Sequence, residues 1–216
     1  MSKMKKYEIY KSVLDIADKY NLGRHCFIGK GSEGRAYKVG NEVVKLYNST
    51  EFTKDIKYSK VITTQDIKSS SFVFPKKLFI VDDILVGYIY DYYPNDILQE
   101  SLKNPNETYE IDLERLKRSY DKMYRNLSVL TNDGIAAFDL ACNILYNGES
   151  IKAIDTIKYA PSTEACKNFS SLDKGLKYYI HRFNRNYGTS KDICEDADIN
   201  YIDHLVKKYG SKIYNR

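Results

Sequence analysis

Three polar residues in the second half of the chain are of types that could act together on a phosphate group. Asp139 and Asn143 lie in the segment GIAAFDLACNIL, and Asp155 follows the apolar residues of SIKAI. In magnesium-assisted phosphoryl transfer, one carboxylate accepts the proton of a hydroxyl, while an amide and a second carboxylate hold the metal ion. Taken singly, Asp139 and Asn143 could be turn residues and Asp155 a cap. The prediction of a phosphoryl-transfer site therefore depends on whether the chain also contains the other groups such a site needs, in the right order.

A glycine-rich stretch and a lysine come earlier in the chain. Gly29, Gly31 and Gly34 stand at G-x-G-x-x-G spacing in FIGKGSEGRAY, and Lys45 follows in the apolar run EVVKLY. Because these glycines lie between two expected strands, the pattern lacks the strand-to-helix context of a dinucleotide-binding fold. A glycine turn inside a hairpin lets backbone N–H groups approach phosphate oxygens closely. Lys45 either points under this loop toward such oxygens or is a surface lysine on an edge strand.

The first 93 residues are expected to form about five strands and one helix. The helix is predicted over residues 7–20, where apolar side chains recur on one helical face, and residues 50–67 are weakly helical. The clearest strands form two hairpins and cover GRAYKV, EVVKLY, FVFPKKLFIV and ILVGYIYDYY. The two hairpins are expected to turn at Gly40-Asn41 and at Asp82-Asp83.

After Pro94 the pattern becomes mainly helical. The longest predicted helix covers residues 111–134, and Gly134 ends it. Its apolar face consists of Leu113, Leu116, Tyr120, Met123, Leu127 and Leu130. Two short strand-like pieces follow at 143–148 and 150–156, and the last sixty residues, including LDKGLKYYIHRFNRNY, are mostly helical. The sequence therefore predicts an α+β fold, with residues 1–93 as one lobe and 94–216 as the other lobe of one domain.

The composition argues against a nucleic-acid-binding, a membrane-spanning and a cysteine-based metal-binding protein. The chain has 216 residues, 43% of them hydrophobic, and a net charge of +5 that is spread without a dense basic block. We expect neither a nucleic-acid partner nor a membrane, since no apolar run reaches membrane-spanning length. Cys26, Cys142, Cys166 and Cys194 form no metal-binding pattern, which favours reduced thiols. The expected location is therefore the cytoplasm, or the host cytoplasm for a viral protein.

Taken in order, these parts resemble the protein-kinase-like superfamily, including its small bacterial and viral members. The resemblance runs from about Phe27 to Thr156. IGKGSEGRAY resembles the glycine-rich loop, VVKL the lysine strand, YIYDYYPNDIL the hinge, FDLACNIL the catalytic loop and IDT the metal-binding motif. The resemblance implies a two-lobed kinase-like fold, with a five-stranded antiparallel first lobe and a truncated, mainly helical second lobe.

The same resemblance implies ATP and Mg²⁺ as cofactors and a role for each matched residue. Lys45 would pair with the α- and β-phosphates, Asp139 would be the catalytic base, and Asn143 and Asp155 would hold Mg²⁺. The remaining nucleotide-binding residues would be Gly29, Gly31 and Gly34 over the phosphates, Ala36 and Val43 above the adenine, Leu145 below it, Tyr90 as gatekeeper, and Asp91 and Tyr92 at its edge.

Several positions depart from the superfamily's pattern. Ala137 and Phe138 replace a His-Arg pair, and Asn143 follows Asp139 by four positions instead of five. Ala141 replaces the lysine of Ser/Thr kinases, and no helix glutamate stands clearly placed to pair with Lys45.

Three interpretations therefore stay open. The first is an active kinase for a protein Ser, Thr or Tyr residue or a small-molecule hydroxyl. The second is a pseudokinase that docks on a partner, such as another kinase or a regulatory protein. The third is a small α+β domain whose motif match is accidental. Magnesium-dependent binding of ATP separates the first interpretation from the other two.

Overall fold

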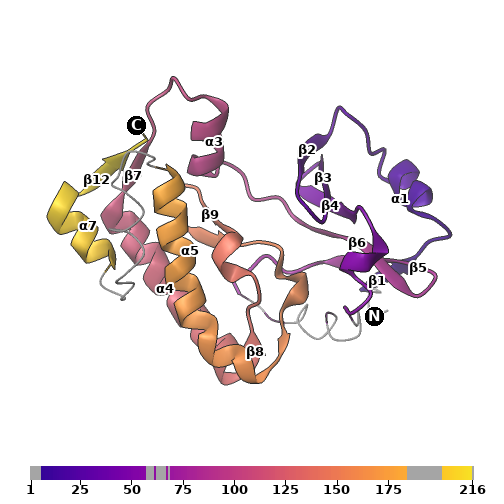
Figure 1. Cartoon of the computed structure of the whole chain (residues 1–216). Helices are drawn as coiled ribbons and strands as arrows, with labels where there is room; N and C mark the ends of the chain where they lie inside the picture. Colours follow the sequence, from indigo (N-terminus) through magenta and orange to yellow (C-terminus); the bar gives the residue numbers. More distant parts are fainter. Residues whose placement is uncertain (1–5, 57–60, 62–66, 68, 184–200, 216) are drawn as a thin grey trace, which may run out of the picture. The chain divides into compact units, whose positions relative to one another are not determined.

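The chain folds into two units that each combine helices and strands (Figure 1). The computed structural model describes residues 6–56, 61, 67, 69–183 and 201–215. Unit 1 comprises Met1–Lys68 and Val73–Tyr92, and unit 2 comprises Ser69–Phe72 and Tyr93–Arg216. The fold class is α+β, as the sequence predicted. Within the described ranges, no helix combines the length and apolar character that a membrane crossing requires.

Unit 1 is built on one six-stranded sheet. Its strands lie in the order β1 (Tyr7–Ile9), β5 (Lys77–Val81), β6 (Ile84–Asp91), β4 (Glu42–Tyr47), β3 (Gly34–Val39) and β2 (Phe27–Lys30). All neighbouring strands are antiparallel except β1, which pairs in parallel with β5. The expectation of a five-stranded, wholly antiparallel sheet was therefore wrong by this one edge strand.

The strand β1 occupies residues that the sequence assigned to a helix. The helix α1 (Val13–Lys19) begins only after Ser12, whose side chain accepts a hydrogen bond from the N–H of Asp15, while the Asp15 carboxylate accepts one from the N–H of Ser12. This reciprocal capping box fixes the start of a helix. Residues before it are free to extend, so the helical prediction over 7–20 was too long at its N-terminal end.

Glu8 links β1 to both of its neighbours. Its carboxylate accepts hydrogen bonds from Lys19 of α1 and from Lys77 of β5, each at 2.7 Å. Burial raises the pKa of Glu8, but the hydrogen bonds from Lys19, Lys77 and Tyr10 outweigh burial and lower that pKa to about 2. The carboxylate therefore stays ionised at neutral pH and holds the short edge strand in place.

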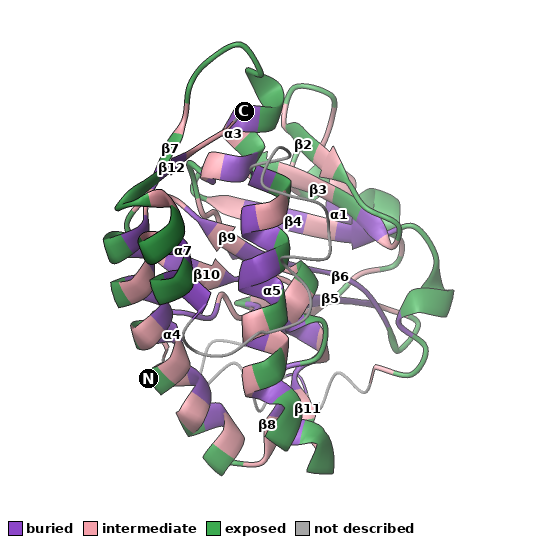
Figure 2. Ribbon diagram, turned by 60° about the vertical axis from the view of Figure 1, so that its left-hand side comes forward, coloured by how far each residue is buried: buried purple, intermediate pink, exposed green. Residues whose placement is uncertain are grey.

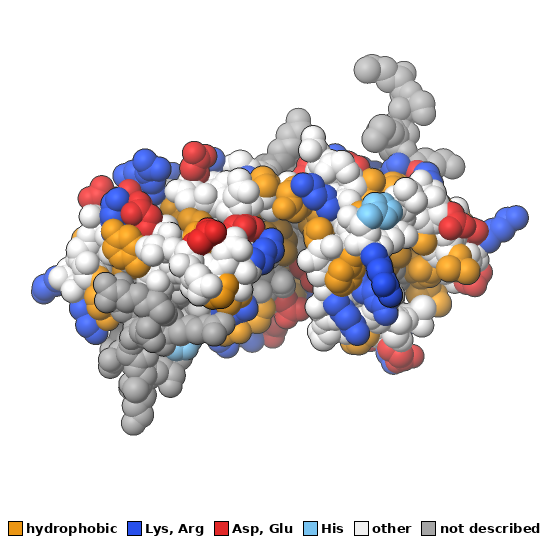
Figure 3. All heavy atoms as spheres, turned by 90° about the horizontal axis from the view of Figure 1, so that it is seen from above, with side chains coloured by type: hydrophobic (Ala, Val, Ile, Leu, Met, Phe, Trp, Pro, Cys, Tyr) orange, Lys and Arg blue, Asp and Glu red, His pale blue; other side chains and the backbone are white. Residues whose placement is uncertain are grey.

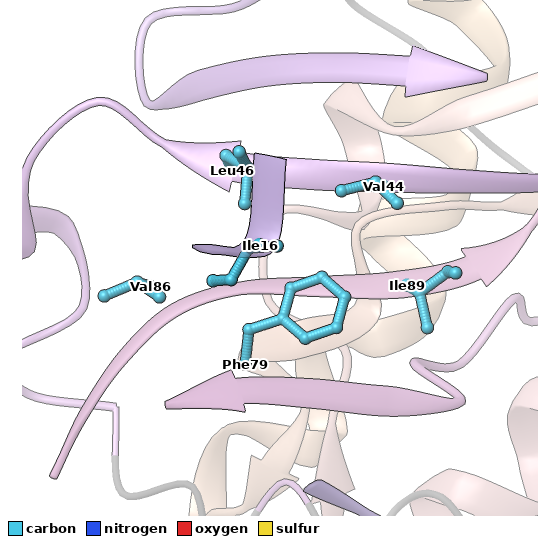
Figure 4. Close-up of a cluster of buried hydrophobic side chains, with 6 residues drawn as sticks. All are labelled: Ile16, Val44, Leu46, Phe79, Val86 and Ile89. Atoms are coloured by element: carbon cyan, nitrogen blue, oxygen red, sulfur yellow. The ribbon is translucent and has the colours of Figure 1, made fainter. Parts of the chain in front are cut away.

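The core of unit 1 lies between α1 and one face of the sheet (Figure 4). The buried side chains are Ile16 from α1 and Val44, Leu46, Phe79, Val86 and Ile89 from the strands. Because side chains alternate along a strand, the inward Val44 and Leu46 place Lys45 on the opposite face of β4. This is the alternation that the sequence predicted for EVVKLY.

Both predicted hairpin turns are present in unit 1. Val39 pairs with Glu42 across Gly40-Asn41, and Gly40 has a φ of 60°. Val81 pairs with Ile84 across Asp82-Asp83, whose φ values are 49° and 61°. Two successive residues with positive φ characterise the type I′ turn that suits the twist of a hairpin.

Unit 2 consists mainly of helices, with short two-stranded ladders between them. The helices are α3 (Ile97–Lys103), α4 (Leu113–Asn132), α5 (Asn168–Phe183) and α7 (Tyr201–Tyr209). The ladders pair β7 (Glu110–Asp112) with β12 (Lys212–Tyr214), β8 (Ile135–Ala136) with β11 (Ala160–Pro161), and β9 (Ile144–Tyr146) with β10 (Ile151–Ala153). The predicted helix at 111–134 is confirmed from Leu113 to Asn132, whereas residues 111–112 belong to β7. All six residues of its predicted apolar face are buried. Figure 2 shows buried segments, in purple, along the helices of this unit.

Two of the sequence predictions fall partly outside the described residues. The weak helix expected at 50–67 is described only as a 3-10 turn, η1 (Thr50–Phe52), because residues 57–60 and 62–66 lie outside the described ranges. The helical segment LDKGLKYYIHRFNRNY is confirmed as α5 up to Phe183, and its last residues lie outside those ranges as well.

Candidate functional site

Asp139 and Asn143 stand at the two ends of a single 3-10 turn in unit 2, η2 (Leu140–Cys142). Asp139 enters this turn with a φ of 60°, a left-handed conformation that aspartate and asparagine tolerate better than most residues. Its carbonyl oxygen accepts hydrogen bonds from the N–H of Cys142 at 3.1 Å and from the Asn143 amide Nδ2 at 3.0 Å. These bonds fix the Asn143 side chain against the backbone of Asp139.

Asp155 begins a second 3-10 turn of the same kind, η3 (Thr156–Lys158), with a φ of 58°. The N–H of Ile154, the residue before it, donates to the carbonyl oxygen of Asn143 at 3.0 Å. Thr156 and Ile157 are buried, which anchors the turn in the interior of unit 2. The three polar residues predicted from the sequence are therefore brought together by these two turns.

Both carboxylates act on the same buried ring. Tyr159 is 1% exposed, and burial raises the pKa of its hydroxyl, which the negative charges of Asp155 and Asp139 raise further. A cation balances one of them, since Lys158 Nζ lies 3.0 Å from Asp139 Oδ2. The site thus combines two carboxylates, one amide and one lysine.

The segment Ser69–Phe72 supports this arrangement from a distant part of the sequence. The N–H of Ala153, at the end of β10, donates to Ser71 O at 2.8 Å, and Phe72 forms a parallel bridge with Ala153. The ring of Phe72 meets that of Tyr159 edge to face, with centroids 6.0 Å apart. Both contacts fix the backbone just before and just after Asp155.

Asn168 holds the chain that leads into Asp139, although no local pattern in the sequence indicates this role. It is 2% exposed at the start of α5, and its Oδ1 accepts a hydrogen bond from the N–H of Ala137 at 2.7 Å. Its Nδ2 donates to Thr131 Oγ1 at 3.0 Å and to Ile135 O at 2.8 Å. A buried amide whose oxygen and both N–H groups are hydrogen-bonded fixes the backbone at Ala137, two residues before Asp139.

Gly175 of α5 lies directly beneath the η2 turn. A Cβ at this position would lie 2.4 Å from Ile144 Cδ1 and 2.9 Å from Ala141 Cα. The methyl end of Ile144 can rotate away, whereas the Ala141 backbone can move only together with the turn. The α5 helix therefore approaches the turn more closely than any larger residue would allow.

Gly175→Ala is expected to destabilise the protein by about 1–2 kcal/mol, because an overpacking cost of about 1–3 kcal/mol outweighs a helix-propensity gain of about 0.5–1 kcal/mol. Urea denaturation measures this difference. Lys174→Ala, at an exposed position of the same helix, is the matched control and is expected to change stability by about 0.5 kcal/mol or less. A Gly175→Ala variant as stable as the wild type would show that the turn is not packed against α5.

The glycine-rich stretch of unit 1 contains glycines of two kinds. A Cβ at Gly34 would lie 2.4 Å from Leu46 O, so the packing of β3 on β4 requires glycine there. A Cβ at Gly29 or Gly31 would meet nothing within 4 Å, and neither residue has a positive φ. Close packing and a left-handed backbone therefore do not require glycine at these two positions, and Gly29 follows a register shift in the pairing of β2 with β3.

Lys45 lies in the middle of β4, between β3 and β6. It stands opposite Ala36 on one side and Tyr88 on the other, and its Nζ is 5.6 Å from the centroid of the Tyr47 ring and 5.8 Å from that of Tyr88. Val43, two residues earlier, is 2% exposed. The aromatic faces attract the ammonium group and restrict where it can lie.

The other residues predicted to contact an adenine are divided between the units. In unit 1, Asp91 forms an ion pair with Lys76 at 2.9 Å, and the N–H of Tyr92 donates to Asn41 O at 2.9 Å. In unit 2, Leu145 is half-buried in β9, opposite Lys152 of β10.

Figure 3 shows acidic and basic side chains interspersed on the visible face, in line with the mixed composition. Throughout the described part of the chain, no group of three or more His, Cys, Asp or Glu residues is arranged to hold a metal ion. A pair such as Asn143 and Asp155 needs further oxygens from a bound phosphate, as magnesium sites in phosphoryl-transfer proteins do.

Among the comparisons with known proteins, the one with solved structures bears on the fold. No family model and no curated protein matches the sequence. Among solved structures, the crystal structure of the BubR1 kinase domain matches with a TM-score of 0.52 and 16% sequence identity. The match covers 83% of this chain and 68% of the BubR1 chain. The protein therefore has a kinase-like fold, as the resemblance of its motifs implied.

Proposed function

We propose that this protein is an ATP-dependent phosphotransferase that moves the γ-phosphoryl group of Mg·ATP to a hydroxyl acceptor. The observation that carries the proposal is the pair of 3-10 turns in unit 2, each preceded by an aspartate with a left-handed backbone conformation. They bring together Asp139, Asn143 and Asp155, residues from two separate segments of the chain. Strained backbone at polar residues recurs at functional sites, where the surrounding fold maintains it.

The residues present fit a magnesium ion. Asn143 directs its Nδ2 to the Asp139 backbone, so its Oδ1 is the free end of the amide, and Asp155 contributes a carboxylate. Oxygen ligands of these two kinds, completed by phosphate oxygens and water, are what Mg²⁺ prefers. When bound, the ion would neutralise charge on the β- and γ-phosphates.

The remaining residues act on the nucleotide and on the acceptor. Backbone N–H groups of the Gly29–Gly34 stretch would cover the phosphates, and Lys45 would bind the α- and β-phosphates. Asp139 would orient the acceptor hydroxyl and take its proton as the new bond forms. The adenine contacts that we propose are Ala36, Val43, Asp91 and Tyr92 of unit 1 and Leu145 of unit 2.

The acceptor that we propose is a protein Ser or Thr residue in the cytoplasm, with a small-molecule hydroxyl as the alternative. Ala141 stands where Ser/Thr kinases of the superfamily have a lysine, so the acceptor class depends on other groups near Asp139.

A second candidate function is a pseudokinase that binds another kinase or a regulatory protein. Two observations favour it. Ala137 and Phe138 replace the charged pair of the catalytic loop, and the turn from Asp139 to Asn143 is one residue shorter than the superfamily's pattern. A binding module of this kind requires no magnesium for its stability.

Thermal unfolding with ATP, in the presence and absence of Mg²⁺, tests the proposal. At a ligand concentration of 100 times Kd, binding adds about 2.7 kcal/mol of stability. We expect a rise of roughly 5–10 °C in the midpoint for Mg·ATP, and Asp155→Ala is expected to lose the magnesium-dependent part of this rise.

A nucleotide-free baseline and one control variant keep this result interpretable. Alanine at a left-handed position costs about 1–2 kcal/mol by itself, so each variant is compared with its own nucleotide-free midpoint. Asp83→Ala removes an exposed aspartate of the same conformation, φ 61°, from a hairpin turn and should keep the full response. Equal stabilisation by ATP with and without Mg²⁺, or none at all, would contradict the phosphotransferase proposal and favour the pseudokinase.

A further inference from the structure

Lys158 is a charged group at the site for which the superfamily's pattern has no counterpart. Its backbone is fixed between two buried residues, Ile157 and Tyr159, and the N–H of Tyr159 donates to Thr156 O at 3.1 Å to close the η3 turn. From this anchored position its Nζ reaches Asp139 Oδ2 at 3.0 Å. The side chains of Lys158 and Asp139 are 29% and 56% exposed, so a ligand can approach the pair.

The position of this ammonium group matters because of what Asp139 would do. A base that takes the proton of the acceptor hydroxyl lies within one hydrogen bond of the attacking oxygen. A cation 3.0 Å from that carboxylate lies close to the phosphorus that the oxygen attacks. Charge on a transferring phosphoryl group spreads over three equatorial oxygens, and a fixed cation beside them stabilises it.

The segment around Asp139, GIAAFDLACNIL, contains no cationic side chain of its own. Ala137, Phe138 and Ala141 are uncharged, although they occupy positions that carry charged or polar groups in the superfamily's pattern. Lys158 comes from the η3 turn instead, three residues after Asp155. The two turns that assemble the carboxylates thus also deliver a lysine to Asp139.

We propose that Lys158 is a catalytic residue that contacts the transferred phosphoryl group and replaces the charge absent from the loop around Asp139. The inference rests on the proposed phosphotransferase function. In the step, a lone pair of the acceptor oxygen forms a bond to the γ-phosphorus, and the bond from that phosphorus to the β–γ bridging oxygen breaks. ADP leaves with the electron pair, the hydroxyl proton moves to Asp139, and Lys158 stays protonated throughout.

A simple surface ion pair is the competing explanation. Exposed pairs of this kind contribute about 0–1 kcal/mol to stability and have no effect on a phosphoryl group. Removing Lys158 would then change neither the binding of nucleotide nor the binding of any phosphoryl mimic. The two explanations therefore differ in whether Lys158 strengthens the binding of a phosphoryl mimic.

Thermal unfolding with Mg·ADP, and with Mg·ADP plus aluminium fluoride, measures the binding of such a mimic. The measurement does not require that the acceptor be identified. Aluminium fluoride occupies the place of the transferred phosphoryl group and mimics its charge in the transition state. We expect the wild type to be stabilised by Mg·ADP and stabilised further by aluminium fluoride. Lys158→Met is expected to keep the first rise and to bind the aluminium fluoride complex about 100-fold more weakly.

Two variants complete the design. Lys158→Arg keeps the positive charge and is expected to retain part of the further stabilisation by aluminium fluoride. This variant also keeps the test valid if Lys158→Met folds poorly. Lys167→Met breaks a comparable ion pair, with Glu164 at 2.9 Å in the same unit, and is expected to behave as the wild type.

The response to Mg·ADP and the further response to aluminium fluoride test the proposed function and the role of Lys158 separately. No rise with Mg·ADP in the wild type would overturn the proposed function, and the role of Lys158 with it. A rise with Mg·ADP that aluminium fluoride does not increase, or an increase that Lys158→Met retains in full, would overturn the role of Lys158 and leave nucleotide binding in place.

Discussion

Asparagine in place of Asp139 is expected to slow phosphoryl transfer from Mg·ATP about 10²–10⁴-fold, the contribution typical of a positioned general base. The variant is expected to bind Mg·ATP as the wild type does, because metal and phosphate binding are assigned to other residues. Asparagine suits the position, since it tolerates the left-handed backbone with φ 60° that Asp139 adopts. The fold should therefore be preserved while the proton acceptor is lost.

The rate of ADP formation measures this effect, and the intact mass of the protein records any transfer to itself. Asp133→Asn is the matched control, because Asp133 is an exposed aspartate at the end of α4, six positions earlier in the chain. That variant should turn over as the wild type does. If Asp139→Asn retained wild-type turnover, Asp139 would not be the base.

The parts of the fold that the sequence predicted correctly are those set by short-range periodicity. The face of α4 follows from six apolar residues at three- and four-residue steps, and the turn at Asp82-Asp83 follows from two residues that tolerate positive φ between apolar runs. In each case the signal lies within one element, so no tertiary information is needed to read it.

The failures come from pairings between distant segments. The strand β1 gains its stability from β5, some seventy residues away, and β7 from β12, about a hundred residues away. Three-residue strands carry too few side chains for a pattern of their own. The capping box at Ser12 and Asp15 was the one local signal that could have separated β1 from α1.

In the candidate site, too, local patterns could be read from the sequence and long-range contacts could not. The types and spacing of Asp139, Asn143 and Asp155 were visible in the sequence because each stands beside an apolar strand or turn. Asn168 and Lys158 were not visible, since their roles depend on hydrogen bonds to residues 31 and 19 positions away. A buried asparagine at a helix start and a lysine after a strand have no distinguishing local pattern.

Alanine in place of Asp96 is expected to cause the largest loss of stability, about 3–5 kcal/mol, the range found when one partner of a buried charged network is removed. Asp96 is 4% exposed at the start of α3. Its Oδ1 accepts hydrogen bonds from the N–H of Tyr146 at 2.9 Å and from the Tyr179 hydroxyl at 2.7 Å, and its Oδ2 accepts one from the N–H of Gln99 at 3.0 Å. Removing the carboxylate leaves the buried Tyr146 N–H and Tyr179 hydroxyl, and the partly buried Gln99 N–H, without this acceptor.

Chemical denaturation of Asp96→Ala, Tyr179→Phe and the double variant measures how strongly the network is coupled. We expect the double variant to lose about 1–3 kcal/mol less than the sum of the single losses, because each single change already breaks the shared bond. Additive losses would show that the two side chains act independently. A loss below about 1 kcal/mol for Asp96→Ala would contradict the network's structural role.

Asp96→Asn separates the hydrogen bonds of this network from its charge. Burial raises the pKa of Asp96, and the hydrogen bonds from Tyr146, Tyr179 and Gln99 offset that rise only in part. An acid whose pKa is higher in the folded state stabilises the fold most below its unfolded pKa and loses this contribution as pH rises through the folded value. Asparagine does not titrate, so the stability advantage of wild type over Asp96→Asn should narrow as pH increases. An advantage that widened with pH would mean that the ionised carboxylate, and not the protonated one, is what the buried network favours.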